Sequence, residues 1–247
     1  MRLGVNLGYW GAGNDADNLE LAREADRLGY SVVWAAEAYG SDSPTVLAWI
    51  AAQTERIDVG SAVMQIPART PAMTAMTAAT LDTLSGGRFR LGLGVSGPQV
   101  SEGWHGVRFD KPLGRTREYI DIVRMALDRK KLSYQGQHYT LPLPDGPGKS
   151  IQLTVHGART DIPIYVAAVG PKNLELAGEK ADGWLAIFPS AEYLPEQLAH
   201  IAAGREKNFY IQLAARMGYE AEAAEIQDRF LGKQYREAAA AVPFDFI

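Results

Sequence analysis

GSAVMQIPARTP, residues 60–71, begins with a run of small and apolar residues and then breaks into a loop that holds two prolines and an arginine. A short continuous apolar run of this kind is typical of a strand that is buried on both faces, as in a parallel sheet covered by helices. Proline cannot donate a hydrogen bond to a sheet, so the strand must end where the prolines begin. The stretch therefore predicts a buried strand whose carboxyl end opens into a stiff loop.

Five further apolar runs repeat this pattern along the chain. Segments with helical spacing separate them, such as DADNLELAREADRLG at 15–29, which has a cap candidate at Asp15 and a stop signal at Gly29. Alternating strands and helices predict an α/β fold, a TIM-type (β/α)8 barrel. The six expected strands are Leu3–Leu7, Val32–Ala36, Val59–Gln65, Phe89–Val95, Ile164–Val169 and Trp184–Phe188.

A long excursion from about Gln99 to Asp161 interrupts the alternation. It holds a helical segment, TREYIDIVRMALD at 116–128, and then a hairpin-like stretch rich in proline and glycine, YQGQHYTLPLPDGPGKS at 134–150. Insertions into a barrel often cover its active face, at the carboxyl ends of the strands. We expect the excursion to lie there.

The strand count falls short of a closed barrel. Eight strands are needed, and only helical patterns follow Pro189. We expect a single barrel domain over residues 1–247, with segments of the full protein omitted near Gly204–Lys207 and after 247. The alternative is a truncated barrel. Under the first interpretation, the segment before Glu206 would be the most mobile part of the protein, and the Cα atoms across the join would lie farther apart than in a continuous chain.

Composition excludes several classes of function. The formal charge of −4 gives no basic field for nucleic acid, no apolar run is long enough to span a membrane, and the N-terminus has no secretory signal. There is no cysteine, and no two of the four histidines have metal-binding spacing, so we predict no metal site. A cytoplasmic protein that handles small molecules is the expectation.

The polar and glycine-rich loops follow the expected strands. After the fifth strand, Gly170 and Pro171 lead into a helix near Lys172, where free backbone N–H groups and a positive helix end would receive a phosphate. Glu37, at the end of the second strand, is the carboxylate whose position indicates a function. The alternative is a structural role, in which Glu37 forms a salt bridge to Arg69 or to another cation of the loops.

Three longer stretches resemble a known family. They are VVWAAEAYGSD, the region from GSAVMQIPARTP to GVSGPQVSEGW, and IPIYVAAVGPKNLELAGEKADGW. Together they resemble the luciferase-like oxidoreductases, especially the actinobacterial branch that uses the deazaflavin coenzyme F420. The segments SGGRFRLGLG at 85–94 and AGEKADGW at 177–184 look like signatures of that family, and we do not expect the physics of a barrel alone to require either of them.

The resemblance implies a cofactor site. Members of this family carry a bulge with a non-prolyl cis peptide on the third strand, which falls at Ala62–Val63 here, and the bulge supports the central ring of the cofactor. By the same resemblance, Gln65 binds the polar edge of the ring, Ser96 and Gly97 line it, and the phosphate of the cofactor is held by Gly170, Pro171 and Lys172.

Two positions depart from the dehydrogenases of that family. Their catalytic histidine and glutamate correspond to Ala38 and Pro98 here, so the chemistry of those enzymes does not transfer. The remaining candidates for catalysis are Glu37, Tyr39 and Glu102.

The resemblance favours an F420-dependent oxidoreductase that transfers a hydride between the deazaflavin and an unidentified small organic substrate. The alternatives are an FMN-dependent monooxygenase of the same fold and a non-enzymatic flavin-binding protein. A homodimer is also expected, through the helix MTAMTAATLDTLSGG at 73–87, whose small residues suit close helix packing.

Overall fold

The computed structural model describes residues 2–11, 13, 15–187, 189–205, 225 and 229. These residues fall into two compact units, which we describe separately. Residues up to Val169 together with Lys180–Ile187 belong to the first unit, and Gly170–Glu179 with the described residues from Pro189 onward belong to the second. The expected join near Gly204–Lys207 and the expected mobility around it fall on residues outside the described part of the chain.

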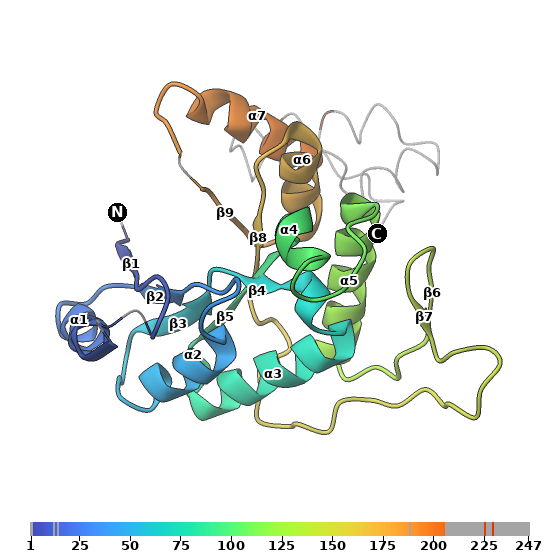
Figure 1. Ribbon diagram of the computed structural model, residues 1–247, viewed down its shortest axis with the longest axis horizontal. Helices are drawn as coiled ribbons and strands as arrows, with labels where there is room; N and C mark the ends of the chain where they lie inside the picture. The colour runs from blue at the N-terminus through green and yellow to red at the C-terminus, as the bar shows by residue number, and fades with distance from the viewer. Residues whose placement is uncertain are drawn as a thin grey trace. The chain divides into compact units, whose positions relative to one another are not determined.

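A parallel sheet forms the centre of the first unit (Figure 1). The strand order is β1-β2-β3-β5-β8-β9, with β4 also paired to β5. All six expected strands are present, and none beyond these barrel positions joins the sheet within the described residues. The strands are β1 (Gly4–Asn6), β2 (Val32–Ala35), β3 (Asp58–Ser61), β4 (Met64–Gln65), β5 (Phe89–Gly94), β8 (Ile164–Ala167) and β9 (Gly183–Leu185).

The third expected strand is interrupted in the middle. Gly60 pairs with Arg90 and Met64 with Leu93, so four residue steps on one strand face three on its neighbour, which is a one-residue bulge. The peptide bond between Ala62 and Val63, inside this bulge, is cis. The predicted bulge and the predicted cis bond are both confirmed.

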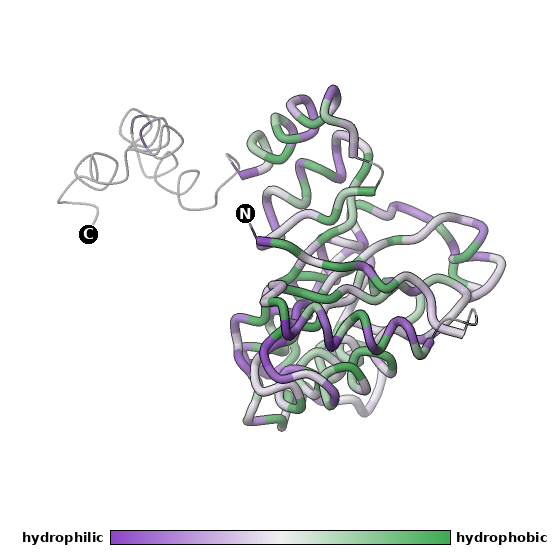
Figure 2. The backbone as a smooth tube through the Cα atoms, turned by 90° about the vertical axis from the view of Figure 1, so that its left-hand side faces the viewer, coloured by the Kyte–Doolittle hydropathy of each residue, from purple (hydrophilic) through white to green (hydrophobic). Residues whose placement is uncertain are grey.

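Helices follow the strands of the first unit, as the alternating pattern predicts. Figure 2 shows hydrophilic and hydrophobic residues alternating along the helical turns, which is the pattern of helices with one buried face. The helix predicted from Asp15 begins at that residue itself, so Asp15 is in the first turn and not the cap, and Gly29 follows with φ +79°. The helices are α1 (Asp15–Arg27), α2 (Ser43–Ala51), the 3-10 turn η1 (Ile66–Ala68), α3 (Pro71–Leu84), α4 (Pro98–Ser101) and α5 (Pro112–Leu127).

The excursion contains the expected helix and hairpin. Helix α5 packs against α3, and the antiparallel strands β6 (Tyr134–Gln135) and β7 (Thr140–Leu141) form the hairpin. The carboxylate of Glu118 on α5 fixes this hairpin, because it accepts hydrogen bonds from the backbone N–H groups of Gln137, His138 and Tyr139 at 2.8, 2.9 and 3.0 Å.

The segment SGGRFRLGLG has a physical role at almost every position, contrary to our expectation. Ser85 caps the carboxyl end of α3, and Gly86 and Gly87 turn the chain with φ +67° and +83°. The guanidinium of Arg88 donates to five acceptors that tie β5 to the chain around α2, namely the carbonyls of Ser85, Ile57, Ala51 and Thr54 and the hydroxyl of Thr54.

The second half of that segment belongs to the tightest part of the sheet. Gly92 has no room for a side chain, since a Cβ there would lie 1.8 Å from the carbonyl oxygen of Ser61. The Ser61 hydroxyl donates to the Gly92 carbonyl and accepts from its N–H, both at 2.9 Å. Sheet packing therefore requires glycine at this position.

The segment AGEKADGW is explained in the same way. Asp182 accepts from the backbone N–H of Ile164 at 2.8 Å, Trp184 donates to the carbonyl of Ala168 at 2.8 Å, and Lys180 contacts Asp121 at 2.9 Å. A Cβ on Gly183 would lie 2.2 Å from the ring of Tyr165. These contacts place β8, β9 and α5 together in the first unit.

The second unit contains α6 (Pro171–Lys180), except for its last residue Lys180, and α7 (Leu194–Arg205). Their backbones touch at two glycines: a Cβ on Gly178 would lie 2.0 Å from the carbonyl oxygen of Ile201, and one on Gly204 would lie 1.9 Å from that of Glu175. None of the helices in the described residues has the length and apolar content that a membrane span requires.

Candidate functional site

The residues predicted at strand ends are distributed over the loops that follow β2, β4 and β5. Glu37 follows β2, and its carboxylate is nearly buried, with a side-chain exposure of 9%. It accepts from Arg69 at 2.8 Å and from the hydroxyl of Ser43 at 3.0 Å, and Arg69 also contacts Asp42. The salt bridge to Arg69 that the sequence left open is confirmed, so the carboxylate of Glu37 binds a cation of its own chain.

Gln65, at the end of β4, is buried with an exposure of 2%. Its Nε2 donates to the carbonyl of Ala38 at 2.5 Å, which holds the side chain across to the loop after β2. Its Oε1 is buried and has no hydrogen-bond partner. Buried acceptors are almost always paired, so this oxygen is suited to accept from an N–H group of a bound ligand.

Ser96 and Gly97 follow shortly after the residue that pairs with Gln65 in the sheet. Gln65 pairs with Gly94, and Ser96 follows two residues later with φ +60°. Gly97 is the cap residue of the short helix α4. The bulge is close as well, since a Cβ on Gly94 would lie 2.5 Å from a methyl group of Val63. The structure thus brings the residues predicted to line the cofactor ring to one edge of the sheet.

The other two catalytic candidates have different surroundings. Tyr39 is 72% exposed. Glu102 accepts from the backbone N–H of Phe109 at 3.0 Å and lies 3.7 Å from Arg108, so its carboxylate closes the loop that follows α4. Neither the contacts of Glu37 nor those of Glu102 join these two carboxylates into an acid–base pair.

The residues predicted to bind phosphate belong to the second unit. Helix α6 begins at Pro171, next to the expected start, and the Gly170 carbonyl accepts from the N–H groups of Asn173 and Leu174. A Cβ on Gly170 would meet no atom within 4 Å, so the backbone there is open. The side chain of Lys172 is 73% exposed and lies 3.3 Å from Glu175.

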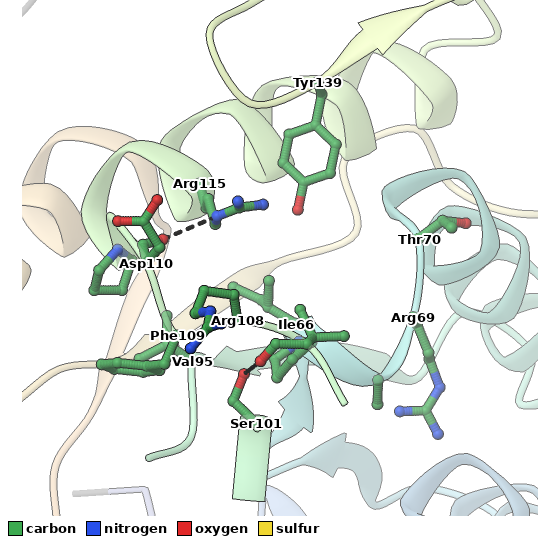
Figure 3. A pocket seen from close by; sticks show the side chains of 14 residues that line it. Ile66, Arg69, Thr70, Val95, Ser101, Arg108, Phe109, Asp110, Arg115 and Tyr139 are labelled. Atoms are coloured by element: carbon green, nitrogen blue, oxygen red, sulfur yellow. Dashed lines mark hydrogen bonds between the residues drawn. The ribbon is translucent and has the colours of Figure 1, made fainter. Parts of the chain in front are cut away.

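A cavity of about 310 Å³ adjoins the carboxyl ends of β4 and β5 (Figure 3). Its volume is at the lower end of the range of small-molecule pockets, about 300–1,000 Å³. The sequence did not single it out, because its walls come from the loop after β4, the segment after α4, the start of α5 and the hairpin. Its lining residues are Ile66, Pro67, Ala68, Arg69, Thr70, Val95, Ser101, Val107, Arg108, Phe109, Asp110, Pro112, Arg115 and Tyr139.

One wall of the cavity is held by Tyr119 of α5, a fully buried side chain. Its hydroxyl donates to the carbonyl of Arg69 at 3.1 Å and pairs with the hydroxyl of Thr74 at 2.5 Å. Burial raises the pKa of this phenol, so it stays protonated and keeps donating. Tyr119 thereby fixes the loop that leaves β4.

Another wall of the cavity is held by Glu118, which orders the hairpin that carries Tyr139. Burial acts to raise the pKa of Glu118, but the three backbone N–H donors outweigh burial and hold the pKa below its ordinary value. The carboxylate therefore stays ionised at neutral pH. The position of Tyr139 therefore depends on the charge of Glu118. From the sequence alone, Glu118 could be recognised only as part of a predicted helix.

Comparison with known proteins identifies the family. The profile of the family described as luciferase-like monooxygenase matches residues 8–210. The chain is 41% identical, over 100% of its length and 86% of the other, to a Mycobacterium tuberculosis protein classed as a coenzyme F420-dependent oxidoreductase. It is 32% identical over 75% of its length to the 5,10-methylenetetrahydromethanopterin reductase of Methanolobus tindarius, of which it covers 54%.

Solved structures share the fold. The coenzyme F420-dependent tetrahydromethanopterin reductase of Methanopyrus kandleri matches all of this chain and 84% of its own, with a TM-score of 0.70 at 20% identity. An F420-dependent secondary alcohol dehydrogenase matches 84% of this chain and 64% of its own, with a TM-score of 0.72 at 18% identity. The bulged third strand, the parallel sheet and the profile over residues 8–210 agree, and the chain belongs to the luciferase-like monooxygenase family.

Proposed function

We propose that this protein is a coenzyme F420-dependent oxidoreductase that transfers a hydride between the deazaflavin and a small organic substrate. The observation that carries the proposal is the 41% identity, over the whole chain, with the M. tuberculosis protein classed by that activity. When bound, the deazaflavin supplies the atom that gives or takes the hydride, and the protein supplies orientation and a dry pocket.

The residues at the sheet edge fit such a cofactor. Gln65 presents a buried amide oxygen whose own amide nitrogen is fixed by Ala38, so its direction is set before a ligand arrives. In the proposal this oxygen accepts from the polar edge of the ring, while Ala62, Val63, Ser96 and Gly97 line it. Gly170, Pro171 and Lys172 are proposed to bind the phosphate, on the strength of the open backbone at the start of α6.

The catalytic acid or base stays a proposal. Glu37 has its carboxylate bound to Arg69, and Glu102 closes a loop, so both have structural partners. Tyr39 is the most exposed of the three and stands next to Ala38, whose carbonyl binds Gln65. We rank Tyr39 first for donating a proton to a substrate beside the ring.

Cofactor titration tests the proposal. Coenzyme F420 is expected to bind at least about 10-fold more tightly than FMN, a difference of about 1.4 kcal/mol. Gln65→Leu, which removes the amide oxygen, is expected to weaken F420 binding by about 10-fold. Gln53→Leu is the matched control, because Gln53 lies at the surface and bonds to Arg23. FMN binding without F420 binding would favour the FMN-dependent monooxygenase, and cofactor binding without turnover under any reductant would favour the flavin-binding protein.

A homodimer through α3 is the second part of the proposal. The small residues that we expected at the contact, Ala75, Ala78 and Ala79, are buried within their own unit. The outer face instead presents Met73, Met76 and Leu84, with exposures of 50%, 51% and 66%. Apolar side chains of this size on one helix face are typical of an interface.

The expected cytoplasmic location stays a prediction.

Light scattering measures the oligomeric state of the protein directly. The protein is expected to have the mass of a dimer at micromolar concentration, and Met76→Lys is expected to shift it to the monomer, because a charge would be buried in the interface. Arg27→Lys, on α1, is the control. A monomer mass for the unmodified protein would refute the dimer.

A further inference from the structure

The cavity at the ends of β4 and β5 has an apolar part next to the proposed cofactor ring. Ile66 follows Gln65 directly, and Val95 precedes Ser96, so the strand side of the cavity continues from the residues proposed to line the ring. Phe109 and Pro112 add further apolar surface. A ligand bound there would present a hydrocarbon body toward the ring.

The charged residues of the cavity are mainly positive. Three arginines and one aspartate are among its lining residues. Arg69 is already paired with Glu37 and Asp42, and Arg108 is 81% exposed and 3.7 Å from Glu102. Arg115 differs from both, because it has no carboxylate partner among the ion pairs of the described residues.

Arg115 is held ready to bind an anion. Its Nε donates to the backbone carbonyl of Asp110 at 2.9 Å, which fixes the stem and leaves the outer N–H groups of the guanidinium directed toward the cavity. Figure 3 shows the carboxylate of Asp110 on the side away from Tyr139. A guanidinium fixed in this way matches the two oxygens of a carboxylate.

Tyr139 supplies a second donor at the same place. In Figure 3 its hydroxyl and the guanidinium of Arg115 point toward one another. Burial raises the pKa of this phenol, although the charge and the hydrogen bond of Arg115 act to lower it, so the hydroxyl keeps its proton at neutral pH. Glu118 sets the position of Tyr139 through the backbone of the hairpin.

We propose that this cavity binds the carboxylate of the substrate through Arg115 and Tyr139, with the hydrocarbon part of the same molecule lying on Ile66, Val95 and Phe109. The substrate class is therefore a small organic acid with an apolar body. This inference rests on the proposed function for the reaction, since it names the substrate that the deazaflavin would meet.

The experiment compares two probes of equal shape on the full chain, with and without F420. Hexanoate carries the carboxylate, and hexanamide is its neutral counterpart. Calorimetric titration is expected to show that hexanoate binds roughly 10-fold more tightly than hexanamide, and that Arg115→Gln removes this preference. Tyr139→Phe is expected to weaken hexanoate binding several-fold, and Arg115→Lys to retain part of it.

Arg27→Gln is the matched control, since Arg27 forms an exposed pair with Glu24 on α1. Equal binding of the two probes, no binding of either, or an unchanged preference in Arg115→Gln would overturn the proposal. A loss of affinity for F420 but not for its tail-less chromophore in Arg115→Gln would assign the cavity to the cofactor tail instead. Arg115-dependent binding of hexanoate without any binding of F420 would keep the carboxylate site and reject the proposed function.

Discussion

Gly92→Ala is expected to destabilise the protein by about 3 kcal/mol or more, because a methyl group there would overlap the backbone of the neighbouring strand. The nearest atom, the carbonyl oxygen of Ser61, would lie 1.8 Å away, and a methyl of Leu185 would lie 2.9 Å away. A backbone atom in a paired strand cannot yield as a flexible side chain does. The two hydrogen bonds between Ser61 and Gly92 would be displaced as well. Urea denaturation followed by circular dichroism measures the loss.

Gly146→Ala is the matched control for this substitution. A Cβ there would come no closer than 3.9 Å to another residue, the N of Gly148. The change is expected to alter the free energy of unfolding by less than about 0.5 kcal/mol. If Gly92→Ala were as stable as Gly146→Ala, this result would contradict the close contact between the backbones of Gly92 and Ser61.

Arg88→Met is expected to destabilise the protein by about 2–4 kcal/mol, since it keeps the apolar stem but removes all five donated hydrogen bonds. The carbonyls of Ala51, Thr54 and Ile57 would lose their partner in the part-buried region between α2 and β5. Thermal or urea unfolding measures the effect.

Arg88→Lys separates geometry from charge. The ammonium of lysine reaches fewer acceptors at once than the guanidinium of arginine does. The stability of the Arg88→Lys variant is therefore expected to lie between those of the unmodified protein and of Arg88→Met. Arg27→Met at the surface is expected to be nearly neutral. A neutral Arg88→Met would mean that water replaces these hydrogen bonds without loss.

The sheet could be predicted from the sequence because its strands are continuous apolar runs. Val32–Ala35 and Phe89–Gly94 lie within the expected ranges, and the bulge at Ala62–Val63 followed from the family resemblance. Local patterns of hydrophobicity and chain-breaking residues are sufficient for such elements. The packing role of SGGRFRLGLG was missed, because the partners of Arg88 and Gly92 lie some 30 residues away in the chain.

The cavity could not be predicted from the sequence for a related reason. Arg115 and Tyr139 belong to an excursion, and no periodicity shows that the hairpin returns to the start of α5. Three backbone hydrogen bonds to one carboxylate, that of Glu118, determine this return. For Glu37, the sequence allowed both a functional carboxylate and a salt bridge to Arg69. The salt bridge could be recognised only from the position of Arg69 in the structure.

The clamp between Glu118 and the hairpin has an evolutionary consequence. Glu118 binds N–H groups that every residue except proline possesses, so these three hydrogen bonds do not depend on which side chains occupy positions 137–139. An exchange of Tyr139 for any residue but proline would remove its ring contact with Tyr119 but would keep the hydrogen bond from its backbone to Glu118. A lineage that retains the glutamate is free to sample new ligand preferences by single substitutions at that position, without first having to rebuild the loop that carries it.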